Sequence, residues 1–138
     1  MNRYVKGARG ERELLSKFAE LGFSVMRSAG SGVNSISPDI IAVKSGRGFA
    51  FECKAWESSV AIEPEKYNVL KGWEANTGFK TFIAWRMNGK GWFFIPISKL
   101  RQTEKSYRIS KKEAFENGLS FERLLSIEEN ATIQSQNK

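Results

Sequence analysis

Two predicted strands and the turn between them occupy residues 37–54, which read SPDIIAVKSGRGFAFECK. Asp39–Val43 is mostly a β-branched apolar run, which is typical of a buried strand. Lys44–Gly48 supplies a glycine-containing turn, and Phe49–Lys54 forms the second strand. Because the connection is so short, we expect the two strands to pair as an antiparallel hairpin.

The second strand separates apolar from charged side chains. Side chains two residues apart share one face of a strand, so Glu52 and Lys54 point the same way while Phe51 and Cys53 point to the other side. We expect the apolar face to be core, and a charged pair on the opposite face of a buried strand needs a reason. The hairpin also brings Asp39 close to the Glu52 end, so that two carboxylates converge.

Outward from the hairpin, apolar spacing and turn residues predict the other elements. We expect a helix over residues 9–21, a strand over 23–27, a loop over 55–65, a helix from Pro64 to Gly78 with Tyr67, Leu70 and Trp73 inward, a second hairpin over 80–87 and 91–97, and short helices over 111–117 and 120–127, the last capped by Ser120. The order of these elements predicts an α/β fold with a mixed central β-sheet flanked by helices. The chain reads as one domain, residues 1–129, followed by a polar, frayed tail, residues 130–138.

Charge points to a polyanionic partner. The 138 residues carry a formal net charge of +7 and a pI near 9.7, so nucleic acid is the expected partner and no small-molecule substrate is indicated. Residues 99–112 hold six basic residues and one acid, and Arg3, Lys6 and Arg9 add positive charge near the N-terminus.

Composition excludes several kinds of chemistry and one location. No histidine is present, so a Ser-His-Asp triad, a Cys-His nucleophile and a His-ligated zinc site are impossible. The single cysteine suits a reducing compartment. No apolar run approaches the roughly 20 residues needed to span a bilayer, so we expect no membrane association. The expected location is the cytoplasm, with the nucleoid.

The two carboxylates favour a divalent metal site. A pair of acids without histidine is a hard, oxygen-rich donor set that suits Mg²⁺, with Mn²⁺ as a substitute. Such an ion activates a water molecule and steadies the leaving oxygen, while Lys54 positions the water or balances developing charge. This chemistry is phosphodiester hydrolysis.

A family resemblance makes the prediction specific. Pro38-Asp39, twelve intervening residues and Glu52-Cys53-Lys54 resemble the Pro-Asp…Glu-x-Lys signature of restriction-endonuclease-like nucleases. Three further stretches extend the likeness to the archaeal-type Holliday junction resolvases: GARGEREL at residues 7–14, GFSVMRS at 22–28 and the Ser-Gly pair at 31–32. The resemblance covers residues 4 to about 100.

The resemblance implies a Mg²⁺-dependent homodimeric endonuclease that cuts four-way DNA junctions symmetrically, in recombination and repair, on a restriction-endonuclease-like fold. The family's catalytic residues fall on Glu11, Ser31, Asp39, Glu52 and Lys54, and its metal ligands fall on Glu11, Asp39 and Glu52. Arg12 and Arg27 match basic positions near that site, and with Arg9 they are the expected DNA-binding residues. A homodimer also suits a two-fold symmetric junction that must be cut twice by chains with one site each.

Other interpretations stay open. Each residue taken alone also has an explanation without a catalytic role. An acid such as Glu11 is favoured in the first turn of a helix, and Glu52 with Lys54 is compatible with a charge pair on the surface of a sheet. Ser31 lies in a glycine-rich stretch that is expected to be flexible. The chain departs from the family pattern at residues 60–66, where Glu63 and Glu65 precede Lys66, so this segment is not assigned to junction contacts. The alternative functions are a nuclease of the same fold acting on other DNA, in restriction or repair, and a non-catalytic nucleic-acid-binding module.

Overall fold

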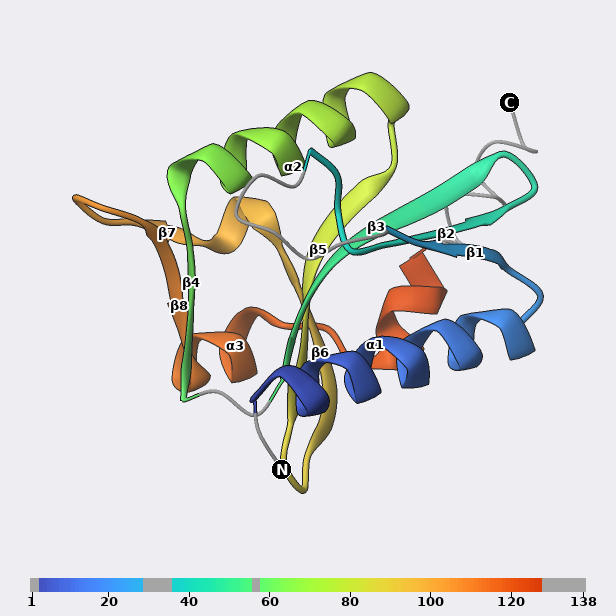
Figure 1. Cartoon of the computed structure of the whole chain (residues 1–138), viewed down its shortest axis with the longest axis horizontal. Helices are drawn as coiled ribbons and strands as arrows, with labels where there is room; N and C mark the ends of the chain where they lie inside the picture. The colour runs from blue at the N-terminus through green and yellow to red at the C-terminus, as the bar shows by residue number, and fades with distance from the viewer. Residues whose placement is uncertain (1–2, 29–35, 56–57, 128–138) are drawn as a thin grey trace.

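A five-stranded mixed sheet forms the centre of the computed structural model, which describes residues 3–28, 36–55 and 58–127 (Figure 1). Its strand order is β1-β2-β3-β5-β6. The strands are β1 Ser24–Arg27, β2 Ile40–Lys44, β3 Arg47–Ala55, β5 Lys80–Met87 and β6 Gly91–Pro96. Only the β3–β5 pair is parallel, because a helix connects these two strands, and the other neighbours are antiparallel. The predicted α/β fold with a mixed central sheet is confirmed.

The predicted β2–β3 hairpin is also confirmed, and its turn sets the register. Ser45 and Gly46 both have positive φ, 53° and 76°, as a two-residue hairpin turn requires. The strands pair from Lys44 opposite Arg47 to Ile40 opposite Phe51.

Two helices cover opposite faces of this sheet (Figure 1). Helix α1, Arg3–Glu20, places Leu14 and Phe18 in an aromatic core with Phe49 and Phe51. Helix α2, Pro64–Thr77, packs against a second core that includes Ile83 and Trp85. The predicted alternation along β3 is confirmed, because Phe51 lies beside Phe82 in the α1 core, while Glu52 and Lys54 are in register with Ile83 and Trp85 on the α2 side.

A second, three-stranded sheet lies beside the main one. One of its strands falls within residues 55–65, where a loop was predicted, so that prediction is wrong for this strand. The second sheet has the order β4-β8-β7, with bounds β4 Ser59–Ile62, β7 Arg101–Gln102 and β8 Tyr107–Ser110. Val60 and Ile62 are buried while Ala61 is exposed, as expected for a strand. The strand escaped prediction because its partner, β8, is far away in the sequence.

The predicted helix boundaries hold where local signals mark them. Helix α2 ends at Gly78, which adopts a left-handed φ of 74°. Helix α3, Lys111–Asn117, begins with a capping box between Ser110 and Glu113. A further helix covers residues 121–127, and Ser120 accepts a hydrogen bond from the Arg123 amide, as predicted.

Smaller features complete the fold. A short 3₁₀ helix, η1 Ile97–Lys99, follows β6. Trp73 is half-buried instead of facing the core, and its indole donates to the Ile36 carbonyl at 2.9 Å. Helix α1 starts six residues earlier than predicted. Within the described part of the chain, no helix is long and apolar enough to cross a membrane. The tail predicted over 130–138 lies outside the described residues, so the domain boundary stays a prediction.

Candidate active site

Asp39 and Glu52 meet at the open end of the β2–β3 hairpin. Since Ile40 pairs with Phe51, the next position along each strand places Asp39 opposite Glu52. The Cys53 amide donates to Asp39 Oδ2 at 2.9 Å, which anchors this carboxylate to the β3 backbone. The predicted convergence of two carboxylates is present.

Glu52 is the most buried charged residue of the site. Its exposed fraction is 8%, and burial raises its pKa from 4.5 to about 8, together with the negative charge and a hydrogen bond of Asp39. The positive charges of Lys66 and Lys54 oppose this rise only in part. Among the described residues, Glu52 Oε1 is buried without a hydrogen-bond partner. A buried carboxylate oxygen of this kind is suited to a cation.

Glu11 approaches the same centre from α1 but is paired with an arginine. Its Oε2 accepts from Arg27 Nε at 2.6 Å, and the Glu11 side chain is 16% exposed. Burial first, and the charge of Asp39 second, raise the pKa of Glu11, while the hydrogen bond and charge of Arg27 lower it. Glu11 therefore lies within electrostatic reach of Asp39.

Cys53 lies within electrostatic reach of all three acids. Burial and the charges of Asp39, Glu11 and Glu52 raise the pKa of its thiol well above 9.0. The thiol is therefore protonated and unreactive at neutral pH, as expected of a packing residue. In the described ranges, however, no three acidic or cysteine side chains are close enough to hold one metal ion as they stand.

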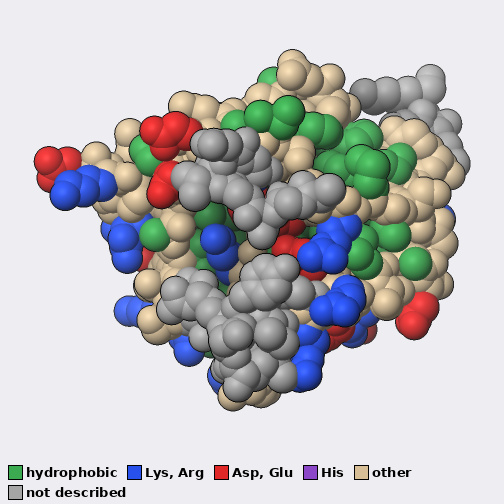
Figure 2. Space-filling view, in the orientation of Figure 1, with side chains coloured by type: hydrophobic (Ala, Val, Ile, Leu, Met, Phe, Trp, Pro, Cys, Tyr) green, Lys and Arg blue, Asp and Glu red, His purple; other side chains and the backbone are tan. Residues whose placement is uncertain are grey.

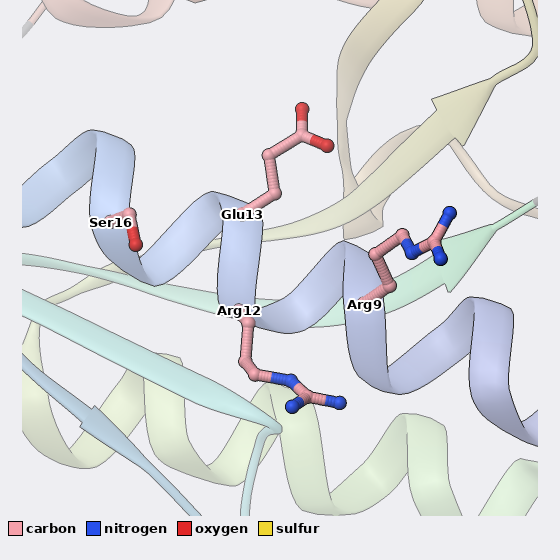
Figure 3. A pocket seen from close by; sticks show the side chains of 4 residues that line it. All are labelled: Arg9, Arg12, Glu13 and Ser16. Carbon is pink, nitrogen blue, oxygen red and sulfur yellow. The ribbon is translucent and has the colours of Figure 1, made fainter.

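Of the remaining predicted residues, Lys54, Arg9 and Arg12 lie in the part of the chain that the structure describes. Lys54 is half-buried, two residues beyond Glu52 on the same face of β3. Ser31 lies outside the described residues. Arg9 and Arg12, with Glu13 and Ser16, line a pocket of about 490 Å³ along α1, in which Arg12 points away from Glu13 (Figure 3).

Two groups of contacts were missed by sequence reasoning. Lys66 of α2 forms an ion pair with Glu52 at 3.5 Å, and its position in the sequence resembled that of any solvated helix lysine. Glu13 accepts from Trp92 Nε1 at 2.8 Å and pairs with Arg86 at 3.3 Å, which ties α1 to β5 and β6. Only the folded chain brings these partners together.

The mixed sheet, with two opposed acids and a lysine at the β2–β3 hairpin, has the arrangement expected of the restriction-endonuclease-like class of nucleases. The family model described as "Archaeal holliday junction resolvase (hjc)" matches residues 2–133. The chain therefore belongs to the archaeal Hjc Holliday junction resolvase family, as its sequence motifs predicted.

Relatives agree with this assignment. The crossover junction endodeoxyribonuclease Hjc of Archaeoglobus fulgidus is 32% identical over 108 residues, 77% of this chain and 79% of that protein. The Hjc of Sulfolobus acidocaldarius is 30% identical over 129 residues, 91% of this chain and 90% of that protein.

Solved structures support the same fold. The A. fulgidus Hjc structure superposes with a TM-score of 0.75 at 26% identity, covering 86% of this chain and 98% of that one. The bacterial homing endonuclease I-Ssp6803I, at 11% identity, shares the fold with a TM-score of 0.58, covering 99% of both chains.

Proposed function

We propose that the centre formed by Asp39 and Glu52 hydrolyses phosphodiester bonds of four-way DNA junctions with Mg²⁺ as its cofactor. Family membership makes the chain a crossover junction endodeoxyribonuclease. The observation that carries the assignment of the centre is the opposed carboxyl pair, in which Glu52 Oε1 is buried, has no hydrogen-bond partner among the described residues and lies 3.5 Å from the Lys66 ammonium.

Asp39 and Glu52 would hold the ion, and Glu11 would complete its donor set. Bound there, Mg²⁺ would supply a water of lowered pKa and charge stabilisation at the phosphate. Mn²⁺, which takes the same oxygen donors, would substitute. Glu11 would join this set through Oε1, since the pair with Arg27 uses Oε2, or would turn both oxygens to the ion if a phosphate oxygen replaced it as the partner of that guanidinium.

Lys54 supplies the positive charge that the chemistry needs next to the acids. It shares the face of β3 with Glu52 and is half-buried, so its ammonium has a restricted range of positions. From there it orients the attacking water and balances the charge that develops on the phosphate. Ser31, matched by the family motif, is proposed as a catalytic contact from the 29–35 segment.

DNA contacts are proposed for three arginines, one on β1 and two on α1. Arg27 is 43% exposed next to Glu11, and Arg9 and Arg12 line the α1 pocket. Figure 2 shows carboxylates near the middle of this face with Lys and Arg side chains beside them, which suits a phosphate backbone passing over an acidic centre.

The active species is proposed to be a homodimer acting on nucleoid DNA in the cytoplasm. A four-way junction has approximate two-fold symmetry and needs two cuts, and the described part of each chain offers one centre of opposed carboxylates. A two-fold dimer therefore presents two centres to the two strands.

Cleavage of a labelled immobile four-way junction tests the proposal. We expect paired symmetric nicks with Mg²⁺ and none with EDTA. Asp39→Asn and Glu52→Gln should each lower the cleavage rate at least about 100-fold while junction binding persists, because each removes charge from the acidic centre. Glu65→Gln, an exposed residue of α2, is the matched control and should cut normally.

The alternatives are separated by the substrate. Equal cutting of linear duplex would favour a nuclease for other DNA. Binding without cutting under every cation would favour a non-catalytic module.

A further inference from the structure

Lys66 is partly buried, and its ammonium lies against the acidic centre. It lies in the first turn of α2, and only 17% of its side chain is exposed. Its Nζ lies 3.5 Å from Glu52 Oε1 and donates to the Ser37 carbonyl at 2.5 Å. The ammonium therefore bridges β3 and the backbone that leads into Asp39.

Local structure does not explain this placement. Lysine is among the residues least often buried, because an ammonium loses its hydration when it leaves water. The first turn of a helix is moreover the positive end of the helix dipole, where a cation is disfavoured. The Ser37 carbonyl supplies only a dipole. The negative charge that Lys66 faces is supplied by the opposed carboxyl pair of Asp39 and Glu52, whose Glu52 Oε1 lies 3.5 Å from the ammonium.

We propose that Lys66 is a positioning residue that serves as the built-in counter-charge of the Asp39–Glu52 pair and competes with the divalent cation for it. This inference rests on the proposed metal centre. Without a cation, Lys66 is attracted to a net negative pair. With a divalent cation bound, the pair and the ion together are close to neutral, so the attraction is largely lost. Lys66 therefore stabilises the metal-free state more than the metal-bound state.

Whether Lys66 weakens Mg²⁺ binding can be measured without following catalysis. Lys66→Met keeps most of the chain volume and removes the charge. We expect its Mg²⁺ affinity, measured by calorimetry in the absence of DNA, to increase about tenfold, since a unit charge near the ion is removed. In EDTA, Lys66→Met should unfold at a lower temperature than wild type, and Mg²⁺ should raise its melting temperature by more than it raises that of wild type. Lys71→Met, on the exposed side of the same helix, should behave as wild type.

A second pair of variants separates the counter-charge from a purely structural tether. Lys66 reaches Ser37 whether or not the carboxyl pair is charged, so a tether predicts the same loss of stability from Lys66→Met in wild type and in the Asp39→Asn/Glu52→Gln double variant. A counter-charge predicts that the loss in the double-variant background, where the pair carries no charge, is less than half of that in wild type. Lys66→Arg, which keeps the charge, should restore stability in EDTA and return the Mg²⁺ affinity toward the wild-type value.

The outcomes are distinct. If wild type binds Mg²⁺ and Lys66→Met binds it equally or more weakly, the counter-charge inference is overturned while the proposed function stands. Equal losses in the two backgrounds overturn it as well, and this comparison decides even if Lys66→Met is too unstable for calorimetry. If wild type binds no Mg²⁺ and cuts no junction, the metal centre itself is overturned.

Discussion

At the scale of the residue, Glu52 combines burial with a neighbouring acid and thereby links pH to stability. Its pKa is raised from 4.5 in the unfolded chain to about 8 in the fold. Below pH 4.5 both states are protonated. As pH rises toward 8 the unfolded chain ionises first, so the metal-free fold loses stability across this window, up to an upper bound of roughly 5 kcal/mol.

Urea unfolding in EDTA between about pH 5 and pH 8 measures this linkage. We expect the free energy of unfolding of wild type to fall through the window and that of Glu52→Gln to stay flatter, because glutamine does not ionise. Saturating Mg²⁺ should reduce the fall in wild type. Parallel curves for wild type and Glu52→Gln would show that another group is responsible.

At the scale of the element, α1 owes its position to Glu13 as well as to its apolar face. The Glu13 carboxylate accepts from the Trp92 indole, which is 8% exposed, and pairs with Arg86. Glu13→Ala leaves that indole N–H without this acceptor, and we expect a loss of about 1–3 kcal/mol in the free energy of unfolding. Glu20→Ala, at the exposed end of the same helix, is the control and should cost less than about 0.5 kcal/mol.

The contact of Glu13 with Trp92 and Arg86 should also affect the acidic centre. Glu11 lies two residues before Glu13 on α1, so Glu13→Ala should also lower junction cleavage at a temperature where the variant is fully folded. A stable variant with unchanged cleavage would show that Leu14 and Phe18 alone hold α1 in place.

Elements with local signals were predictable from sequence, and those that depend on distant partners were not. The β2–β3 hairpin follows from a short turn, and α2 from a proline start and a glycine end. Strand β4 has only four residues, and its pairing of Ser59 with Ser110 is invisible locally.

The residues of the site also differ in how far they could be predicted from the sequence. Asp39 and Glu52 follow from the hairpin spacing, whereas Glu11 needed the family motif because it comes from a separate helix. Lys66 could not be predicted, because its burial exists only once α2 packs on β3.

At the scale of the whole molecule, part of the chain's positive charge lies on the small sheet, which carries Arg101 and Arg108. Arg101 of β7 and Arg108 of β8 are exposed and directly opposite each other in register, an arrangement of like charges that destabilises a strand pair. Arg101 also pairs with Glu113 at 3.2 Å, which offsets one of the two charges. The remaining charge suits a DNA phosphate, so we expect Arg108 to contact a junction arm.

Arg108→Gln should therefore weaken junction binding and make it less sensitive to salt. Removing one phosphate contact should reduce the slope of log affinity against log salt concentration by about 0.9, with little effect on the cleavage rate of bound junction. The folded state should be unharmed or more stable by a few tenths of a kcal/mol, because the repulsion from Arg101 is relieved. Fluorescence anisotropy at several salt concentrations and thermal unfolding measure the two effects. An unchanged slope with a loss of stability would assign Arg108 to the fold and place the DNA arms elsewhere on the molecule.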